Sequence, residues 1–533
     1  MERIMPEKVK YPIGQQDFKV LRQQGRLYVD KTRYIEQLVE EDQYYFLGRP
    51  RRFGKSLFLS TLKYFFEGER ELFKGLYIDS IEWSWEKYPV LHLDLNPERY
   101  FDKDMLENIL NSRLKEWEKE YDIENDGADY SQRFRRIIES AHKKTGRQVV
   151  ILVDEYDKPL VGNLNRPDQF EYFQEKLASV YSNFKSSAEH IKLVFITGVS
   201  RFSKLSVFSD LNNLRDISFS DDFADICGIT ESELHHYFIP GIQKLADVEG
   251  ISFEEASVEL KLNYDGYRFS RRGSDIYNPW SVLNAMRESA VQDYWAETGK
   301  PTIVVEALRN LNVDLEKILN TDCTLDQLKG LDLSNIEPLP LLYQTGYLTI
   351  KAYDRETKLY NLGIPNREVS RDLFKALLPY YISVERDTPD SVARDILNSI
   401  IKGEPEKMME SINIFLAGIP YEMKIEDENN FHNAIYILLR LIGARTETEV
   451  HTSDGRIDLV VKTPKFIYII ELKFEKDSQT ALNQIEKKQY FNLDMIQDRC
   501  SILVQISIIR HADWINLKFG KSSNHYIRIH NTQ

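Results

Sequence analysis

Cysteine is scarce in this sequence, because the 533 residues contain only Cys227, Cys323 and Cys500. The three are far apart and lack the paired spacing of zinc sites or disulfide frameworks, so we expect reduced thiols in the core. The chain also lacks any run of about 18 apolar residues, and its N-terminal stretch lacks the apolar segment of a signal peptide. We therefore expect a cytoplasmic location and no membrane contact.

Positive charge is in deficit, with 70 Lys and Arg against 84 Asp and Glu, a formal net charge of −14. Such a chain as a whole is repelled by phosphate backbones, so any contact with DNA must be local. Residues 441–533 carry 13 basic and 11 acidic side chains, a net charge of +2 against −16 for the rest of the chain, which makes this end the less repelling one. The length predicts about three domains at roughly 100–200 residues each.

Short apolar runs alternate with long amphipathic segments in residues 1–230, as in VLHLDL, VVILVD and KLVFITG. Runs of this kind predict strands of a parallel sheet joined by crossover helices, so the expected fold class is α/β. Residues 231–345 have a helical pattern instead. Its first helix is predicted to begin with a capping box formed by Thr230 and Glu233.

A polar turn interrupts two alternating segments between Gly346 and Asn366, which predicts a β-hairpin. Because a helix precedes it, the hairpin could be the wing of a winged-helix unit, and an equal alternative is a hairpin that packs against the first domain. A winged helix would indicate a DNA-binding transcription regulator, although no clearly basic recognition helix accompanies it. We assign residues 346–425 to this hairpin and a helical linker, and residues 426–533 to a last domain.

The segment YYFLGRPRRFGKSLFLSTLKYFF reads as an apolar strand, a short basic loop and a helix. The phosphate-loop pattern GxxxxGK[ST] aligns with it from Arg49 to Ser56, with arginine in place of the first glycine. Backbone N–H groups around Gly54 would cradle phosphates, Lys55 would reach the β- and γ-phosphates, and Ser56 would contact Mg²⁺. Arg49 and Arg52 either add phosphate contacts or form a solvated face of the loop.

A second acidic element is needed, because Mg²⁺ requires a carboxylate at the end of a neighbouring strand. The strand in VVILVDEYDKP supplies it: Asp154 would hold Mg²⁺, directly or through water, and Glu155 would orient and deprotonate the attacking water. The alternative is a solvated turn after a core strand. The later strand in LVFITGVSRF ends in Thr197, Ser200 and Arg201, which suit γ-phosphate sensing or, alternatively, ordinary capping.

The C-terminal segment GRIDLVVKTPKFIYIIELKF predicts two strands joined by a turn at residues 462–465. If they form a hairpin, Asp458 faces about residue 469, and the period of two puts Asp458, Glu471 and Lys473 on one face. Two carboxylates there would bind Mg²⁺ or Mn²⁺, and Lys473 would position water and offset phosphate charge. The run FIYII is too apolar for exposure on both faces, so charges at its end require a function.

Two residues flank this constellation as further catalytic candidates. Glu428 precedes the helix FHNAIYILLRLIG, and Gln484 lies on the predicted helix ALNQIEKKQYF. Each is equally explained as helix-surface polarity, and neither is required for metal binding.

The chain resembles the bacterial AAA-ATPase-like family with a C-terminal PD-(D/E)xK nuclease domain. The resemblance lies in RPRRFGKS, VDEYDKP, TGVSRFSK, YDGYRFS with YNPWSVLN, and GRIDLV with IIELKF. It implies a P-loop ATPase core joined to a restriction-endonuclease-like α/β domain, and arginine looks usual in that family at the first P-loop glycine. By position it implies that Lys55 and Ser56 belong to the phosphate loop and that Asp154 and Glu155 form the second ATPase motif. It also implies a nuclease triad of Asp458, Glu471 and Lys473.

We expect from these observations an ATP-binding and ATP-hydrolysing protein with Mg²⁺, whose C-terminal domain cleaves DNA with Mg²⁺ or Mn²⁺ and is gated by ATP. The alternative is a nucleotide-dependent switch in which the nuclease fold is an inactive interaction module. The net charge of −14 favours that alternative mildly, whereas the presence of all three nuclease residues argues against it. An oligomer is compatible with either function.

Overall fold

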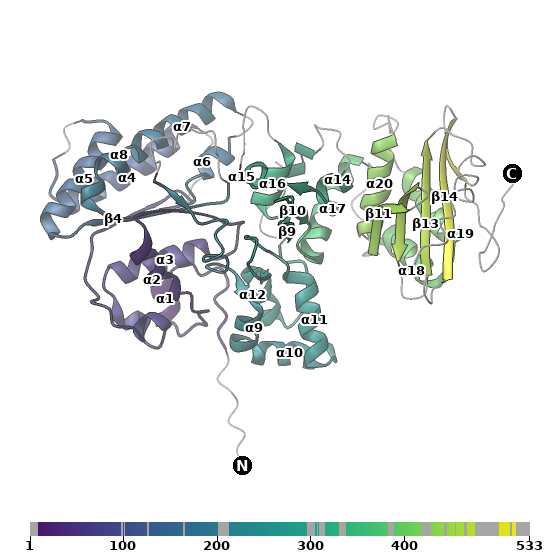
Figure 1. Cartoon of the computed structure of the whole chain (residues 1–533), viewed down its shortest axis with the longest axis horizontal. Coiled ribbons are helices and arrows are strands. Elements are labelled where there is room, and N and C mark those ends of the chain that lie inside the picture. The colour runs from purple at the N-terminus through teal and green to yellow at the C-terminus, as the bar shows by residue number, and fades with distance from the viewer. Residues whose placement is uncertain are drawn as a thin grey trace, which may run out of the picture. The chain divides into compact units, whose positions relative to one another are not determined.

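The computed structural model describes residues 9–96, 100, 102–124, 127–163, 166–200, 213–295, 304–305, 307–308, 315–329, 337–381, 388–417, 428–441, 445–452, 455–462, 466–474, 500–511 and 514–518. The chain divides into two compact units, residues 1–298 with 321–366 and residues 299–320 with 367–533. Figure 1 shows the elements of both. Within the described residues, no helix is long and apolar enough to cross a membrane.

A parallel sheet of five strands forms the centre of the first unit, in the order β2-β3-β4-β1-β5. This confirms the predicted α/β class and gives a core of P-loop type, in which sequential strands are joined by crossovers. Every residue of β3 is buried, as expected for a central strand covered on both faces. The strands are β1 (Tyr44–Gly48), β2 (Val90–Asp94), β3 (Val149–Asp154), β4 (Ile191–Gly198) and β5 (Arg215–Asp216).

Helices cover both faces of this sheet. Helices α1 to α3 lie on one side and α4, α5 and α7 on the other (Figure 1). The helices of the sheet region are α1 (Phe18–Gln23), α2 (Arg33–Glu41), α3 (Lys55–Phe66), α4 (Lys103–Glu120), α5 (Tyr130–Thr145), α6 (Lys158–Val161), α7 (Pro167–Tyr181) and α8 (Asn183–Ser186), with short 3₁₀ turns η1 (Arg70–Phe73), η2 (Tyr77–Asp79) and η3 (Ala188–His190).

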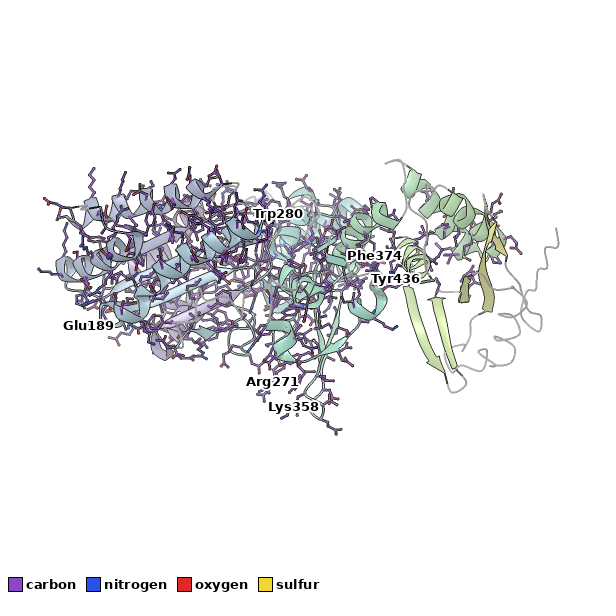
Figure 2. All side chains as sticks on the ribbon, turned by 90° about the horizontal axis from the view of Figure 1, so that it is seen from above. Glu189, Arg271, Trp280, Lys358, Phe374 and Tyr436 are labelled. Carbon is purple, nitrogen blue, oxygen red and sulfur yellow. The ribbon has the colours of Figure 1, made fainter. Side chains whose placement is uncertain are left out.

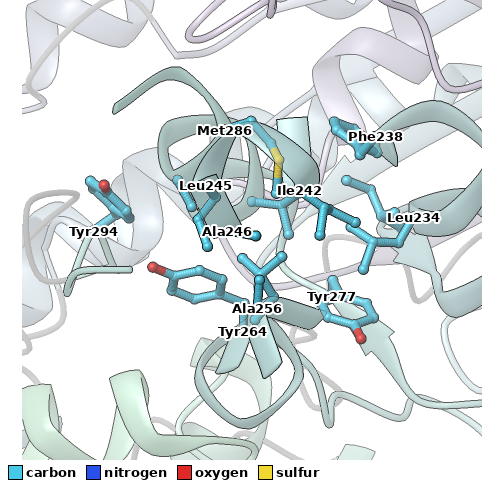
Figure 3. Close-up of a cluster of buried hydrophobic side chains, with 14 residues drawn as sticks. Leu234, Phe238, Ile242, Leu245, Ala246, Ala256, Tyr264, Tyr277, Met286 and Tyr294 are labelled. Carbon is cyan, nitrogen blue, oxygen red and sulfur yellow. The ribbon is translucent and has the colours of Figure 1, made fainter. Parts of the chain in front are cut away.

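A second group of helices follows the sheet in the same unit. Its elements are β6 (Ile229–Thr230), α9 (Glu231–Tyr237), α10 (Ile239–Glu249), α11 (Phe253–Tyr264), β7 (Ile276–Tyr277) and α12 (Pro279–Glu288). The predicted capping box of Thr230 and Glu233 is confirmed at the start of α9. Figure 3 shows the apolar core of this group, in which Leu234, Ile242 and Met286 are fully buried or nearly so.

The predicted hairpin between Gly346 and Asn366 is confirmed. Strands β9 (Thr349–Tyr353) and β10 (Tyr360–Gly363) pair antiparallel, and β8 (Asp322–Cys323) extends the sheet; α15 (Leu325–Lys329) and α16 (Pro338–Thr345) precede β9. The Thr349 hydroxyl accepts a hydrogen bond from the Arg268 backbone N–H at 2.7 Å and donates one to the Arg268 carbonyl at 3.0 Å. These bonds join the hairpin to the segment between α11 and β7 of the same unit, which favours a packed hairpin over a free wing.

The second unit contains a five-stranded mixed sheet in the order β11-β12-β13-β14-β15, in which only β13 and β14 are parallel. Its ring pair of Phe374 and Tyr436, with centroids 5.6 Å apart, links α17 to α20 (Figure 2). The elements are α14 (Leu315–Leu319), α17 (Arg367–Tyr381), α18 (Thr388–Lys402), α19 (Pro405–Ala417), α20 (Glu428–Leu441), β11 (Arg445–Thr452), β12 (Gly455–Lys462), β13 (Phe466–Phe474), β14 (Cys500–His511) and β15 (Trp514–Lys518).

Candidate functional site

The predicted phosphate loop joins the end of β1 to the start of α3. Gly54 caps α3 with a φ of 95°, a left-handed conformation that glycine adopts without strain. A Cβ built there would meet no atom within 4 Å, so the backbone at this point faces open space. Gly54 has no side chain with which to cap the first turn of α3, and the N–H groups at a helix start suit an anion.

The side chain of Lys55 lies inside this loop. It is 5% exposed, and its amine donates hydrogen bonds to the carbonyl groups of Arg49 at 2.9 Å and Pro50 at 3.1 Å. Ser56 follows in the first turn of α3 and is partly buried. The loop therefore wraps around the amine that the sequence predicts to bind phosphates.

Arg49 is fully buried, at 1% exposure, and differs from both expectations for the basic loop. Its ring contact is with Phe269, whose centroid lies 4.3 Å from the guanidinium carbon. Its guanidinium nitrogens donate to four backbone carbonyls: Gly48 at 2.9 Å, Ser218 at 2.7 Å, Phe223 at 3.1 Å and Ala224 at 3.3 Å. This geometry fits a brace between the loop and residues 218–224 better than a phosphate contact.

Arg52 has a φ of 68° and places its guanidinium 4.2 Å from the ring centroid of Trp280, a residue labelled in Figure 2. Trp280 belongs to α12, so this contact joins the phosphate loop to the helical group. Burial lowers the pKa of Arg52, which nevertheless stays a cation at neutral pH.

The acidic residues predicted after β3 lie beside Thr197 at the end of β4. The Thr197 hydroxyl donates a hydrogen bond of 2.5 Å to the Asp154 carboxylate and accepts one of 3.3 Å from the Glu155 N–H. Glu155 has a φ of 50°, and its carboxylate lies 3.7 Å from the Lys158 amine. Thr197 thus links both acids, which gives it a geometry consistent with either a γ-phosphate sensor or a support for Asp154.

Further hydrogen bonds join the turn after β3 to the turn after β4. The Tyr156 N–H donates to the Thr197 carbonyl at 3.0 Å, and the Tyr156 hydroxyl donates to the Ser200 carbonyl at 2.9 Å. The Asp157 carboxylate accepts from the Val199 N–H at 3.1 Å and from the Ser200 N–H at 2.6 Å. Burial raises the pKa of Asp157 to about 6. We call this set of bonds between residues 154–157 and 197–200 the β3–β4 clasp.

The C-terminal candidates lie on neighbouring antiparallel strands. Leu459 of β12 pairs with Ile470 of β13, so the next pair along this register is Asp458 opposite Glu471. The expected pairing of Asp458 with about residue 469 is wrong, because the register sets Val460 there. The expected register is wrong by two residues. Because side chains alternate between the two faces of a sheet, a shift of two leaves Asp458 on the same face as Glu471 and Lys473.

The remaining predicted residues have less structural context. Glu428 is the first residue of α20. Glu471 itself pairs with Gln505 of the parallel strand β14, a residue that was not among the predicted ones. Arg201 and Gln484 lie outside the described residues.

Known protein families match both the N-terminal and the C-terminal part of the chain. Residues 12–208 match the family described as predicted AAA-ATPase, and residues 426–517 match the PD-(D/E)XK nuclease superfamily. The "uncharacterized protein in vnfD 5′ region" of Azotobacter chroococcum mcd 1 is 34% identical over 498 residues, which cover 90% of this chain and 93% of that protein. The chain belongs to the AAA-ATPase-like family with a C-terminal PD-(D/E)XK nuclease domain.

The residues of the AAA-ATPase-like part fit a nucleotide with its metal. The N–H groups at the start of α3, the buried Lys55 amine and the Asp154 carboxylate belong to elements that end or begin at the same edge of a parallel sheet. Ser56 and Asp154 would hold Mg²⁺. Two protein ligands suffice, because Mg²⁺ at such sites takes its other ligands from phosphates and water.

Sequence reasoning missed three residues at this edge of the AAA-ATPase-like domain. Asp94 ends β2 as the register partner of Asp154, and burial raises its pKa. Asp94 could have been found from the sequence, because it is an acid near the end of the predicted strand VLHLDL. Tyr156 and Asp157 stand within the quoted motif VDEYDKP, but their partners on the β4 turn come from the tertiary structure alone.

Proposed function

We propose that this chain binds and hydrolyses ATP at the loop between β1 and α3, and that its C-terminal domain cleaves phosphodiester bonds in DNA with Mg²⁺ or Mn²⁺. ATP binding gates the cleavage. The observation that supports the ATPase half best is the buried Lys55 amine within the loop, on a sheet whose edge also carries Asp154 and Glu155.

The ATPase chemistry follows from the positions of these residues. Lys55 exchanges its two loop carbonyls for the β- and γ-phosphate oxygens and offsets their charge. Glu155 accepts the proton of the water that attacks the γ-phosphorus, while the bond to the β–γ bridging oxygen breaks and ADP leaves. Mg²⁺ supplies charge neutralisation of the phosphates when bound, and Ser56 and Asp154 hold it.

The nuclease chemistry rests on the register of β12 and β13. Asp458 and Glu471 supply carboxylate ligands of the kind that Mg²⁺ and Mn²⁺ prefer, and Lys473 orients the attacking water and offsets charge on the scissile phosphate. Glu428 and Gln484 are accessory candidates. The substrate is DNA, bound by the C-terminal domain, where residues 441–533 carry 13 basic and 11 acidic side chains in a chain of net charge −14.

A nucleotide-dependent switch with an inactive nuclease fold is the second candidate. The net charge of −14 favours it, because a strongly acidic chain binds nucleic acid weakly overall. The two candidates differ in what Asp458 does, since an inactive module has no need of a metal there.

The experiment that separates them measures plasmid nicking in Mg²⁺ and in Mn²⁺, with and without ATP. We expect nicking by the wild type that ATP changes at least severalfold, and loss of nicking in Glu471→Ala. Lys55→Ala should abolish the effect of ATP. Glu410→Ala, which removes an exposed acid of α19 in the same unit, is the matched control and should nick normally. Equal nicking by wild type and Glu471→Ala would refute the nuclease half.

Calorimetric titration tests the metal site separately from turnover. The proposal expects Mn²⁺ binding that weakens at least tenfold in Asp458→Ala but not in Glu410→Ala. Unchanged Mn²⁺ binding in Asp458→Ala, together with nucleotide binding by the wild type, would support the switch instead.

A further inference from the structure

We propose that Asp157 is a positioning residue for ATP hydrolysis: through the β3–β4 clasp, its carboxylate keeps Thr197 in register with Asp154 and Glu155. The inference rests on the proposed ATPase function. Asp157 itself is 2% exposed and bonds only backbone groups in the hydrogen bonds given above, so it acts through its neighbours.

The cost of burying Asp157 indicates that its position serves a purpose. A carboxylate in a buried site is unfavourable unless hydrogen bonds compensate it. Here the compensation comes from two consecutive N–H groups, those of Val199 and Ser200, and among the described residues no cationic side chain donates a hydrogen bond to it. A neutral side chain would fill the same space without this cost, so the charge is best explained by the rigidity that it gives to the β4 turn.

Close backbone approach makes the clasp rigid. A Cβ built on Gly198 would lie 2.7 Å from the Tyr156 ring and 2.9 Å from an Asp157 carboxylate oxygen, so only glycine fits without displacing the clasp. The Gly198 carbonyl also accepts a hydrogen bond of 3.2 Å from the Arg49 N–H. The same turn therefore contacts the first residue of the phosphate loop and the acidic turn.

A shift of the β4 turn would consequently move Thr197 relative to Asp154 and Glu155. Because small displacements of catalytic groups reduce turnover more than substrate binding, the clasp should affect kcat far more than the affinity for ATP. Lys55 and the start of α3 make most of the expected phosphate contacts, and neither belongs to the clasp.

The test uses the full-length protein with Asp157→Asn, which keeps the shape but puts an amide group against two N–H donors. We expect kcat for ATP hydrolysis to fall at least about tenfold, with KM and the Kd for MgATP within about twofold. Without nucleotide, hydrogen exchange of the Val199 and Ser200 amides should become faster. The matched control is Glu118→Gln, which breaks a buried ion pair to Arg133 between α4 and α5. It should lower the melting temperature and leave kcat and this exchange unchanged.

A second variant guards against failure of Asp157→Asn to fold. Tyr156→Phe removes the bond from the Tyr156 hydroxyl to the Ser200 carbonyl and keeps the ring, and a smaller fall in kcat, about threefold, is expected at unchanged Kd. Wild-type kcat in the folded variants, or a loss of ATP affinity equal to the loss of kcat, would overturn the inference. Absence of ATP hydrolysis by the wild type would instead overturn the proposed function.

Discussion

The hydroxyl of Thr197 lies between the two acidic residues that follow β3: it donates to the Asp154 carboxylate at 2.5 Å and accepts from the Glu155 N–H at 3.3 Å. Thr197 is completely buried, so water cannot replace it in either bond. A hydrogen bond to a charged partner is worth roughly 1.5–3 kcal/mol, enough to fix the orientation of Asp154.

Thr197→Val tests this relationship, because valine keeps the shape of threonine and removes the hydroxyl. We expect kcat for ATP hydrolysis to fall about tenfold and the Mg²⁺ concentration for half-maximal activity to rise, since Asp154 loses its orienting bond. Thr197→Ser retains the hydroxyl and should keep most of the activity. Equal kinetics in the valine and serine variants would show that the hydroxyl is not needed.

Glu155→Gln tests the assignment of the base. Glutamine keeps the size of glutamate but cannot accept a proton, so kcat should fall by at least about 100-fold while the Kd for MgATP stays near the wild-type value. Asp94→Asn provides the comparison, because Asp94 is a partly buried acid at this sheet edge and the register partner of Asp154. A larger loss of kcat in Asp94→Asn than in Glu155→Gln would transfer the role of base to Asp94.

Arg49→Ala should destabilise the first unit. The substitution removes a guanidinium that bonds backbone carbonyls of residues 48, 218, 223 and 224 and leaves a cavity, at a cost of roughly 3–5 kcal/mol. Exposed Arg51 is the control, and Arg51→Ala should change stability by less than about 0.5 kcal/mol. Thermal melting checks both. An unchanged melting temperature with a raised KM for ATP would instead assign Arg49 to the phosphates.

Arg49 also illustrates what the sequence leaves open. A basic loop pattern indicates either phosphate contact or solvation, because arginine is rarely buried. Its burial here depends on carbonyl groups about 170 residues further along the chain, which no local pattern reveals. The β3–β4 clasp has the same character, since the partners of Asp157 become neighbours only when β4 lies beside β3.

Local patterns were sufficient where burial dictates the residue type. The run VVILVD becomes β3 without change, because a strand covered on both faces must be apolar throughout. The capping box at Thr230 depends on two residues three positions apart and was equally readable. The register of β12 and β13 could not be predicted from a local pattern, because it depends on where the connecting turn is centred. A centre one residue later than expected changes the partner of each residue by two positions.

His92 should make the first unit sensitive to mild acid. Burial lowers its pKa to about 4, and its Nε2 atom is shielded from solvent without a hydrogen-bond partner among the described residues. The charges that act on it are those of Asp154, Lys63, Arg113 and Asp17. Between the ordinary histidine pKa of about 6.5 and pH 4, the unfolded chain binds a proton that the folded chain rejects, so unfolding becomes more favourable as the pH falls.

We expect His92→Gln to reduce this acid sensitivity, because glutamine does not titrate. The loss of stability on going from pH 7 to pH 5 should shrink by about 1–2 kcal/mol relative to the wild type. Thermal melting without nucleotide at both pH values measures it. Comparison with the wild type is essential, since Asp157 and Asp265 have pKa values raised to about 6 and act with the opposite sign, weakening the fold as the pH rises from 4 to 6. Exposed His236→Gln should leave the pH dependence unchanged, and an equal change in both variants would contradict the prediction.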